Sequence, residues 1–245
     1  MTKWALDARF VTSGSRRRGG VTKWVAPRRP CGMLHEQMPA AADDPQTITL
    51  LDGTEIGVRP IRPQDRDELK RGMERLGTES RYRRFLAPVG RLTGAQLTYL
   101  TDVDHHDHEA LVGIDTRTGD GIGVARFVRL TSEGDPQAAE FAVTVADDWQ
   151  GRGVGTVLLN LLSDRAREEG VERFRGTMLA TNRPIQDLVG LLGEPHVVAR
   201  EPGTIEIEVE LPPHGAGARL QDMLRAAARG DAALSPRATA AREPD

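Results

Sequence analysis

The chain has little of several features that mark common protein classes. Its single cysteine, Cys31, excludes an internal disulfide and fits a reducing cytoplasm. It has no apolar run of about 18 residues, the length that a membrane-spanning helix needs, so we expect no membrane partner. A net charge of −3 lacks the basic excess of nucleic-acid-binding domains. These absences leave a cytoplasmic globular protein, for which 38% hydrophobic residues suffice to build one core.

The two ends of the chain differ in composition from its middle. Residues 1–31 hold eight Lys or Arg residues and one acid, Asp7, without the apolar stretch of a secretory signal. We expect residues 1–45 to be a disordered basic leader, with Met33 or Met38 as alternative translation starts. Residues 213–245 are rich in Ala, Arg, Gly and Pro and are expected to be a tail with one short helix around Leu220 and Leu224. The folded domain should therefore span residues 46–212.

Within that domain, alternation, helical spacing and turn residues predict a mixed α/β order. Strands are expected at 55–59, 110–115, 122–128, 139–145, 174–179, 197–200 and 204–211. Helices are expected at 65–76, at 78–85 with Thr78 as N-cap, at 93–100, at 154–170 and at 182–193.

The most informative stretch is residues 150–155, Gln-Gly-Arg-Gly-Val-Gly, which joins a predicted strand to a predicted helix. The first N–H groups of a helix have no partner inside it, and the helix dipole makes that end positive. Glycines let this backbone approach a ligand closely. The stretch therefore predicts a phosphate or pyrophosphate site, to which Arg152 would add a cationic fork.

Other glycine-rich motifs fit less well. A Walker A loop needs Gly-Lys followed by Ser or Thr, which is absent after Gly155. A dinucleotide fingerprint needs a different glycine spacing. A plain helix start with tolerated glycines remains the alternative.

These six residues resemble the (Gln/Arg)-x-x-Gly-x-(Gly/Ala) signature of the GNAT superfamily of acyl-CoA-dependent N-acyltransferases. Four further segments, 80–85, 101–104, 139–143 and 147–151, look like the catalytic domain of Pat-type protein lysine acetyltransferases. The resemblance covers roughly residues 47–211.

The resemblance implies a GNAT fold, an α/β architecture with a mixed central sheet of about seven strands, flanked by helices and splayed at the acetyl-CoA site. A bulge within residues 144–147 would open the sheet there. Acetyl-CoA is the expected co-substrate, without a metal. The residues expected to hold it are Val143, Val145, Gln150, Gly151, Arg152, Gly153, Val154, Gly155, Thr156 and Asn182.

Acyl transfer to an amine also needs a proton acceptor, because a lysine with a pKa of about 10.4 is almost wholly charged at neutral pH. Glu140 lies between Ala139 and Phe141, ten residues before Gln150. It matches the position of the catalytic glutamate in the Pat-like family, so we expect it to be the general base. A solvent-facing strand glutamate is the alternative.

Other polar residues allow two interpretations. Asn182 is either a coenzyme contact or a simple helix cap. Residues 185–192 contain no tyrosine, which many GNAT enzymes use as general acid. Residues 102–108 are rich in Asp and His, but their spacing suits no common zinc site, so no metal is expected. Arg81, Arg83 and Arg84 would either bind an anion or form a solvated helix face that packs Tyr82 and Phe85 inward.

The leading functional hypothesis is an acetyl-CoA-dependent acetyltransferase acting on protein lysines, with a partner such as an acyl-CoA synthetase. A small-molecule amine acetyltransferase and a non-catalytic acyl-CoA sensor are the alternatives.

Overall fold

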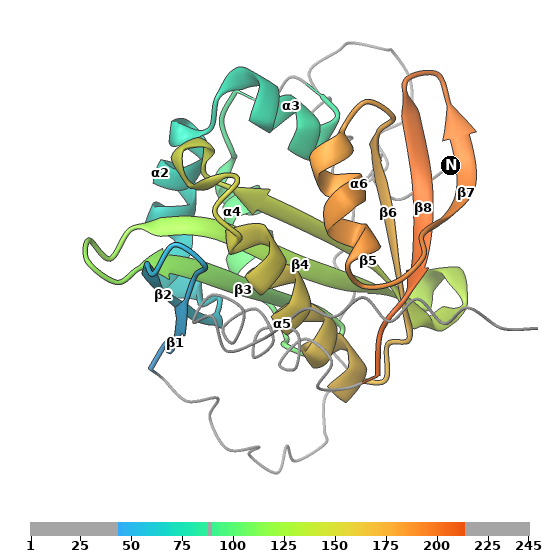
Figure 1. Cartoon of the computed structure of the whole chain (residues 1–245), viewed down its shortest axis with the longest axis horizontal. Helices are drawn as coiled ribbons and strands as arrows, with labels where there is room; N and C mark the ends of the chain where they lie inside the picture. Colours follow the sequence, from blue (N-terminus) through green and yellow to red (C-terminus); the bar gives the residue numbers. More distant parts are fainter. Residues whose placement is uncertain (1–43, 88–89, 214–245) are drawn as a thin grey trace, which may run out of the picture.

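The structure is a computed structural model and describes residues 44–87 and 90–213 (Figure 1). The predicted basic leader lies outside the described residues except for its last two positions, and the predicted tail except for its first. No helix within the described ranges is both long and apolar enough to cross a membrane.

The described residues form one sheet of eight strands with helices on both faces, which confirms the predicted mixed α/β class (Figure 1). The strands are β1 (Gln46–Thr49), β2 (Glu55–Pro60), β3 (His108–Asp115), β4 (Gly121–Leu130), β5 (Asp135–Val145), β6 (Arg173–Leu179), β7 (His196–Glu201) and β8 (Thr204–Glu210). The helices are α2 (Arg66–Arg75), α3 (Thr78–Phe85), α4 (Gly94–Thr101), α5 (Val154–Glu168) and α6 (Arg183–Gly190). Short 3-10 turns lie at Pro63–Asp65, Thr131–Glu133 and Asp147–Trp149.

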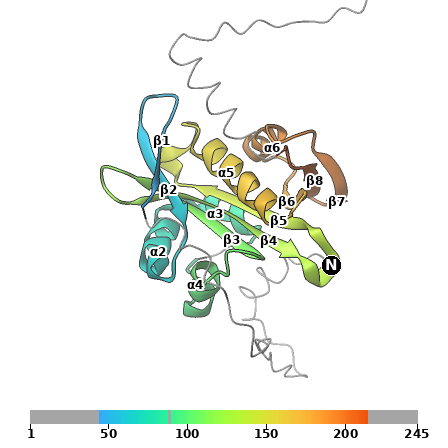
Figure 2. The same ribbon diagram turned by 90° about the horizontal axis from the view of Figure 1, so that it is seen from below.

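The strand order is β1-β2-β3-β4-β5-β6-β8-β7. Figure 2 shows α5 and α6 over one face of the sheet, and α2 and α4 over the other. Because side chains alternate along a strand, β4 sends Phe127 toward the α5 side, where it joins Leu158 and Leu162 in the main core. Its neighbour Arg126 points to the α2 side. The two layers therefore have separate interiors.

The feature that positions the site is a parting of β5 and β6. These two strands pair in parallel through three residue pairs, which end at Glu140 with Arg175. Past that point, residues 141–145 of β5 and 176–178 of β6 line opposite walls of a cleft. The predicted splay of the sheet is therefore present.

The predicted cause of the splay, a bulge at 144–147, is wrong. The β4–β5 register runs without a shift from Ala139 to Val145, and its irregularity lies at Arg129 and Leu130. The Phe141 ring instead lies against Gly176, where an added Cβ would be 2.6 Å from Phe141 Cε1. Packing of this ring between the strands accompanies their separation.

Three local expectations also differ from the structure. Gly77 is the N-cap of α3 and Thr78 is its first helical residue. Tyr82 does not pack inward, since it is 44% exposed. β1 was not predicted, because four residues give too short an alternation to recognise.

His108, at the start of β3, generates a prediction on stability. Burial, with the nearby charge of Arg126, lowers its pKa from 6.5 to about 3. As the pH falls below about 6.5, the unfolded chain takes up a proton that the folded chain refuses, so stability decreases. Between pH 6.5 and 5 the loss from this histidine should be roughly 1.5 kcal/mol in the free energy of unfolding. Urea unfolding of His108→Gln should show that this part of the acid loss has disappeared.

The exposed His196 of β7 is the matched control, and His196→Gln should keep the wild-type pH dependence. His105 acts in the opposite direction, because its hydrogen bond to the buried Glu109, at 2.8 Å, raises its pKa. Its contribution is complete below about pH 6.5 and is lost as the pH rises through the raised value. An unchanged acid slope in His108→Gln would contradict the assignment to His108.

Candidate active site

The cleft between β5 and β6 has a volume of 660 Å³, within the range of about 300–1,000 Å³ usual for small-ligand sites. Nine of the ten residues predicted to hold the coenzyme line it: Val143, Val145, Gln150, Gly151, Arg152, Gly153, Gly155, Thr156 and Asn182. The tenth, Val154, has its side chain buried in the main core and brings only its backbone to the loop.

The loop at one end of the cleft presents backbone donors. Gly151 and Gly153 have φ values of 74° and 90°, in the left-handed region that glycine tolerates best. Gly153 is the N-cap of α5, and no side chain caps the helix there. The N–H groups of the first helical turn are therefore left for an anion in the cleft.

Gln150 holds this loop in place. Its Nε2 donates to the Val145 carbonyl oxygen at 3.1 Å and to Asp147 Oδ1 at 3.0 Å. A longer contact, 3.3 Å, joins it to Ser80 Oγ of α3. Asp147 in turn accepts from the Gly77 N–H at 2.9 Å. The glutamine thus ties the loop to the end of β5 and to α3.

Arg152 lies at the rim of the cleft and is held from the β1–β2 turn. Its Nε and Nη2 donate to Asp52 Oδ2 at 3.0 and 2.8 Å, and Nη2 also donates to Thr54 Oγ1 at 2.7 Å. The guanidinium stacks 4.2 Å from the centre of the Trp149 ring. The Thr54 N–H and Arg152 lower the pKa of Asp52 to about 2, so the pair is ionised at neutral pH. These hydrogen bonds use the Nε–Nη2 side of the fork.

Glu140 stands where β5 and β6 part, as the last β5 residue paired with β6. It is half-buried, and strand alternation puts it on the same face as Ala142 and Thr144. Those two residues line the cleft, whereas Glu140 lies just beyond its lining. The predicted base is therefore adjacent to the cleft.

Asn182 occupies the N-cap position of α6, but its side chain makes no capping hydrogen bond. It lines the cleft beside Pro184 and Ile185. The geometry thus gives no support to a simple capping role for this side chain.

Sequence reasoning missed several residues that line the cleft. Phe141 and Gly176 form its floor, and Asp52 reaches it from a turn 100 residues before Arg152. A glycine inside a strand pattern signals close approach and could have identified Gly176. Nothing local in the sequence marks Asp52. Arg83 and Arg84 line the cleft as well. Of the two interpretations of the arginine cluster, this position suits the one in which it binds an anion.

The Asp- and His-rich loop does not gather into a metal site: within the described ranges no group of three or more His, Cys, Asp or Glu residues could hold an ion. His105 contacts Glu109, and His106 contacts Glu169 of the α5–β6 turn. Asp104 accepts from the N–H groups of His106 and His108. These contacts fasten the loop to its neighbours.

Comparison with known proteins agrees with the fold. The model of the acetyltransferase (GNAT) family matches residues 78–190. Acetyltransferase Pat of Mycolicibacterium smegmatis is 36% identical over 182 residues, which are 74% of this chain and 53% of that protein. Acetyltransferase PA5475 of Pseudomonas aeruginosa is 33% identical over 156 residues, 63% of this chain and 82% of that protein.

Among solved structures, the GNAT domain of S. lividans PAT superposes with a TM-score of 0.63 at 31% identity, covering 68% of this chain and 97% of that domain. The chain spans about half the length of the M. smegmatis Pat protein that it matches. The chain therefore belongs to the GNAT family of acetyltransferases and is similar to the Pat proteins within it.

Proposed function

We propose that this protein transfers an acetyl group from acetyl-CoA to an amine, with protein lysine side chains as acceptors and Glu140 as general base. The observation that carries the proposal is the position of Glu140, at the point where β5 and β6 part, next to a cleft that ends in a glycine loop.

The residues of the cleft fit coenzyme A. The first-turn N–H groups of α5, with Gln150 to Thr156 around them, suit a pyrophosphate. The β6 ladder on β5 stops at Glu140, so the backbone groups of Val143 and the N–H of Val145 on that edge are available to the pantetheine arm, in the manner of an added strand, while the Val145 carbonyl accepts from Gln150. Asn182 faces the same space from α6. The coenzyme supplies the acyl group as an activated thioester.

Glu140 would make the amine reactive. At pH 7.4 about one lysine in a thousand is neutral, which costs about 4 kcal/mol. A half-buried carboxylate between Ala139 and Phe141 can accept the ammonium proton directly or through a water. The neutral amine then attacks the thioester carbonyl without a covalent enzyme intermediate. No tyrosine lies within α6, and a thiol with a pKa of about 8.5 can leave without a side-chain acid.

Protein lysines are favoured as acceptors by likeness to proteins named Pat. We propose an acyl-CoA synthetase in the cytoplasm as the kind of partner. Purified synthetase and a panel of small amines, each incubated with labelled acetyl-CoA, separate the candidates. Rapid turnover of small amines with inert proteins would indicate a small-molecule acetyltransferase. Coenzyme binding without any transfer would indicate a sensor.

Glu140→Gln tests the base. The variant keeps the size of the side chain and removes its basicity, so kcat/KM should fall by about 10²–10⁴ at pH 7.4. The deficit should shrink as the pH approaches the lysine pKa, because the acceptor then loses its proton to solvent. Steady-state kinetics across pH checks both effects.

Glu206→Gln is the matched control, since Glu206 is a half-buried glutamate of β8 on the same face of the sheet. It should keep near wild-type turnover. Wild-type turnover in Glu140→Gln, with coenzyme affinity intact, would refute the role of Glu140.

Arg152→Gln tests the grip on the pyrophosphate. Loss of one charge-assisted contact should raise the Kd for coenzyme A about tenfold, which is about 1.4 kcal/mol in binding free energy. Calorimetry measures this change. Turnover of acetyl-pantetheine, which lacks the pyrophosphate, should be unchanged. Arg183→Gln, at the exposed start of α6, serves as control. Unaltered coenzyme affinity in Arg152→Gln would show that Arg152 only braces the loop against Asp52.

A further inference from the structure

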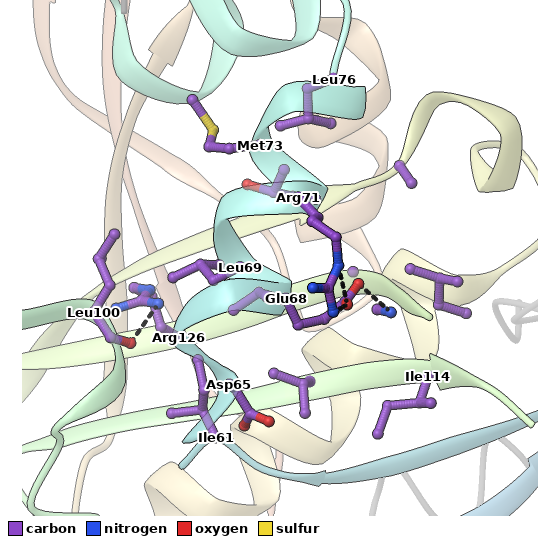
Figure 3. Close-up of a pocket in the computed structure, with 18 of the residues that line it drawn as sticks. Ile61, Asp65, Glu68, Leu69, Arg71, Met73, Leu76, Leu100, Ile114 and Arg126 are labelled. Atoms are coloured by element: carbon purple, nitrogen blue, oxygen red, sulfur yellow. Dashed lines mark hydrogen bonds and ion pairs between the residues drawn. The ribbon is translucent and has the colours of Figure 1, made fainter. Parts of the chain in front are cut away.

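A second cavity, of 260 Å³, lies beneath α2 on the opposite face of the sheet from α5; we call it the α2 cavity. Figure 3 shows its apolar walls, with Leu69 and Met73 from α2, Leu76 from its C-cap, Leu100 from α4, and Ile61 and Ile114 from the sheet side. Glu68 and Arg71 form an ion pair on α2, and Arg126 lies at the other side beside Leu100. The cavity is thus an apolar space with charged groups at its edges.

α2 presents a glycine, Gly72, to this cavity. Helix positions 68, 69, 72, 73 and 76 all line the space, and position 72 is Gly72. A Cβ built on Gly72 would have no atom within 4 Å. Glycine inside a helix is unfavourable relative to alanine, and here it also leaves a void that a larger side chain would fill.

The α2 cavity meets the cleft at the strand that carries the site. Arg84, Ala142 and Thr144 line both spaces. Ala142 and Thr144 follow Glu140 on β5 and share its face. An acyl group delivered beside Glu140 therefore has the mouth of an apolar cavity next to it.

The charges around the cavity disfavour a cationic occupant. Arg84 and Arg126 line it on the side of β5, and both would repel an ammonium group. The acids at its rim are engaged: Asp65 accepts from Arg59 at 2.6 and 2.8 Å, and Glu68 accepts from Arg71 and from the Gly121 N–H. A hydrocarbon chain matches the apolar walls without needing a counter-charge.

We propose that the α2 cavity receives the chain of an acyl-CoA longer than acetyl-CoA, so that this protein also transfers straight-chain aliphatic acyl groups. The inference rests on the proposed acyl-transfer function. The chemistry keeps the same balance: the ammonium group passes one proton to Glu140, and the neutral nitrogen forms a bond to the acyl carbon. The carbon–sulfur bond breaks, the nitrogen loses its second proton to solvent as the amide forms, and coenzyme A leaves as the thiolate, which takes up a proton from solvent.

Calorimetry with inert thioethers of coenzyme A tests the occupant without turnover. S-hexyl-CoA should bind the wild-type protein at least about tenfold more tightly than S-ethyl-CoA, because each buried methylene adds to the affinity. Gly72→Leu fills the cavity, so the two thioethers should then bind within about threefold of each other. Gly72→Ala also removes the unfavourable helix glycine but fills little of the cavity. It should therefore keep most of the preference for S-hexyl-CoA over S-ethyl-CoA. Ratios of kcat/KM for hexanoyl-CoA and acetyl-CoA should follow the same order.

Thermal unfolding serves as the check on folding, and Gly72→Leu should melt no lower than the wild type. Should it fail to fold, Val124→Phe narrows the cavity from β4 instead. Equal affinity of the wild type for both thioethers, or an equal loss for both in the filled variant, would overturn the inference. Chain-length-dependent binding without transfer to any amine would defeat the proposed catalysis and leave this inference standing. Acetyl transfer together with equal affinity for both thioethers would support the proposed catalysis and overturn this inference.

Discussion

The functional architecture depends on how few residues of β5 and β6 pair with each other. Three pairs hold these parallel neighbours together, and the next residues of each strand become walls of a cleft. Parallel strands in a closed sheet would bury those backbone groups in a ladder. Ending the ladder at Glu140 leaves an edge of β5 open to a ligand in the middle of the sheet. It also places one carboxylate at the closed end of that opening.

The parting of the strands is supported by packing on one side and by hydrogen bonds on the other. Phe141 stacks on Phe174 with ring centres 5.4 Å apart, and it covers Gly176, so the floor of the cleft is part of the main core. At the open end, Gln150 and Asp147 join the loop to β5 and to the start of α3. A rigid floor and a fastened rim keep the cleft open without a ligand.

Much of this arrangement could be predicted from the sequence, because its signals are local. The glycine loop, the apolar strand before it and the amphipathic helix after it are contiguous, and family resemblance added Glu140 as the proposed base. The remainder depends on contacts between distant segments. Asp52 meets Arg152 across 100 residues, and Arg84 reaches the cleft from a helix whose pattern also suited a solvated face. The cause of the splay was predicted wrongly, since a ring packed on Gly176 leaves no trace in strand periodicity.

Asp147 accepts from both Gln150 and the Gly77 N–H, so one carboxylate fastens the glycine loop to the junction of α2 and α3. Displacement of that junction strains the loop, and a molecule that changes the conformation of the loop in turn shifts the junction. Thermodynamic linkage makes such an influence mutual. An acceptor that contacts α3 would therefore change the affinity for the acyl donor. The donor would change the affinity for the acceptor by the same factor. A side chain that contacts neither reactant would be the coupling element between the two binding events.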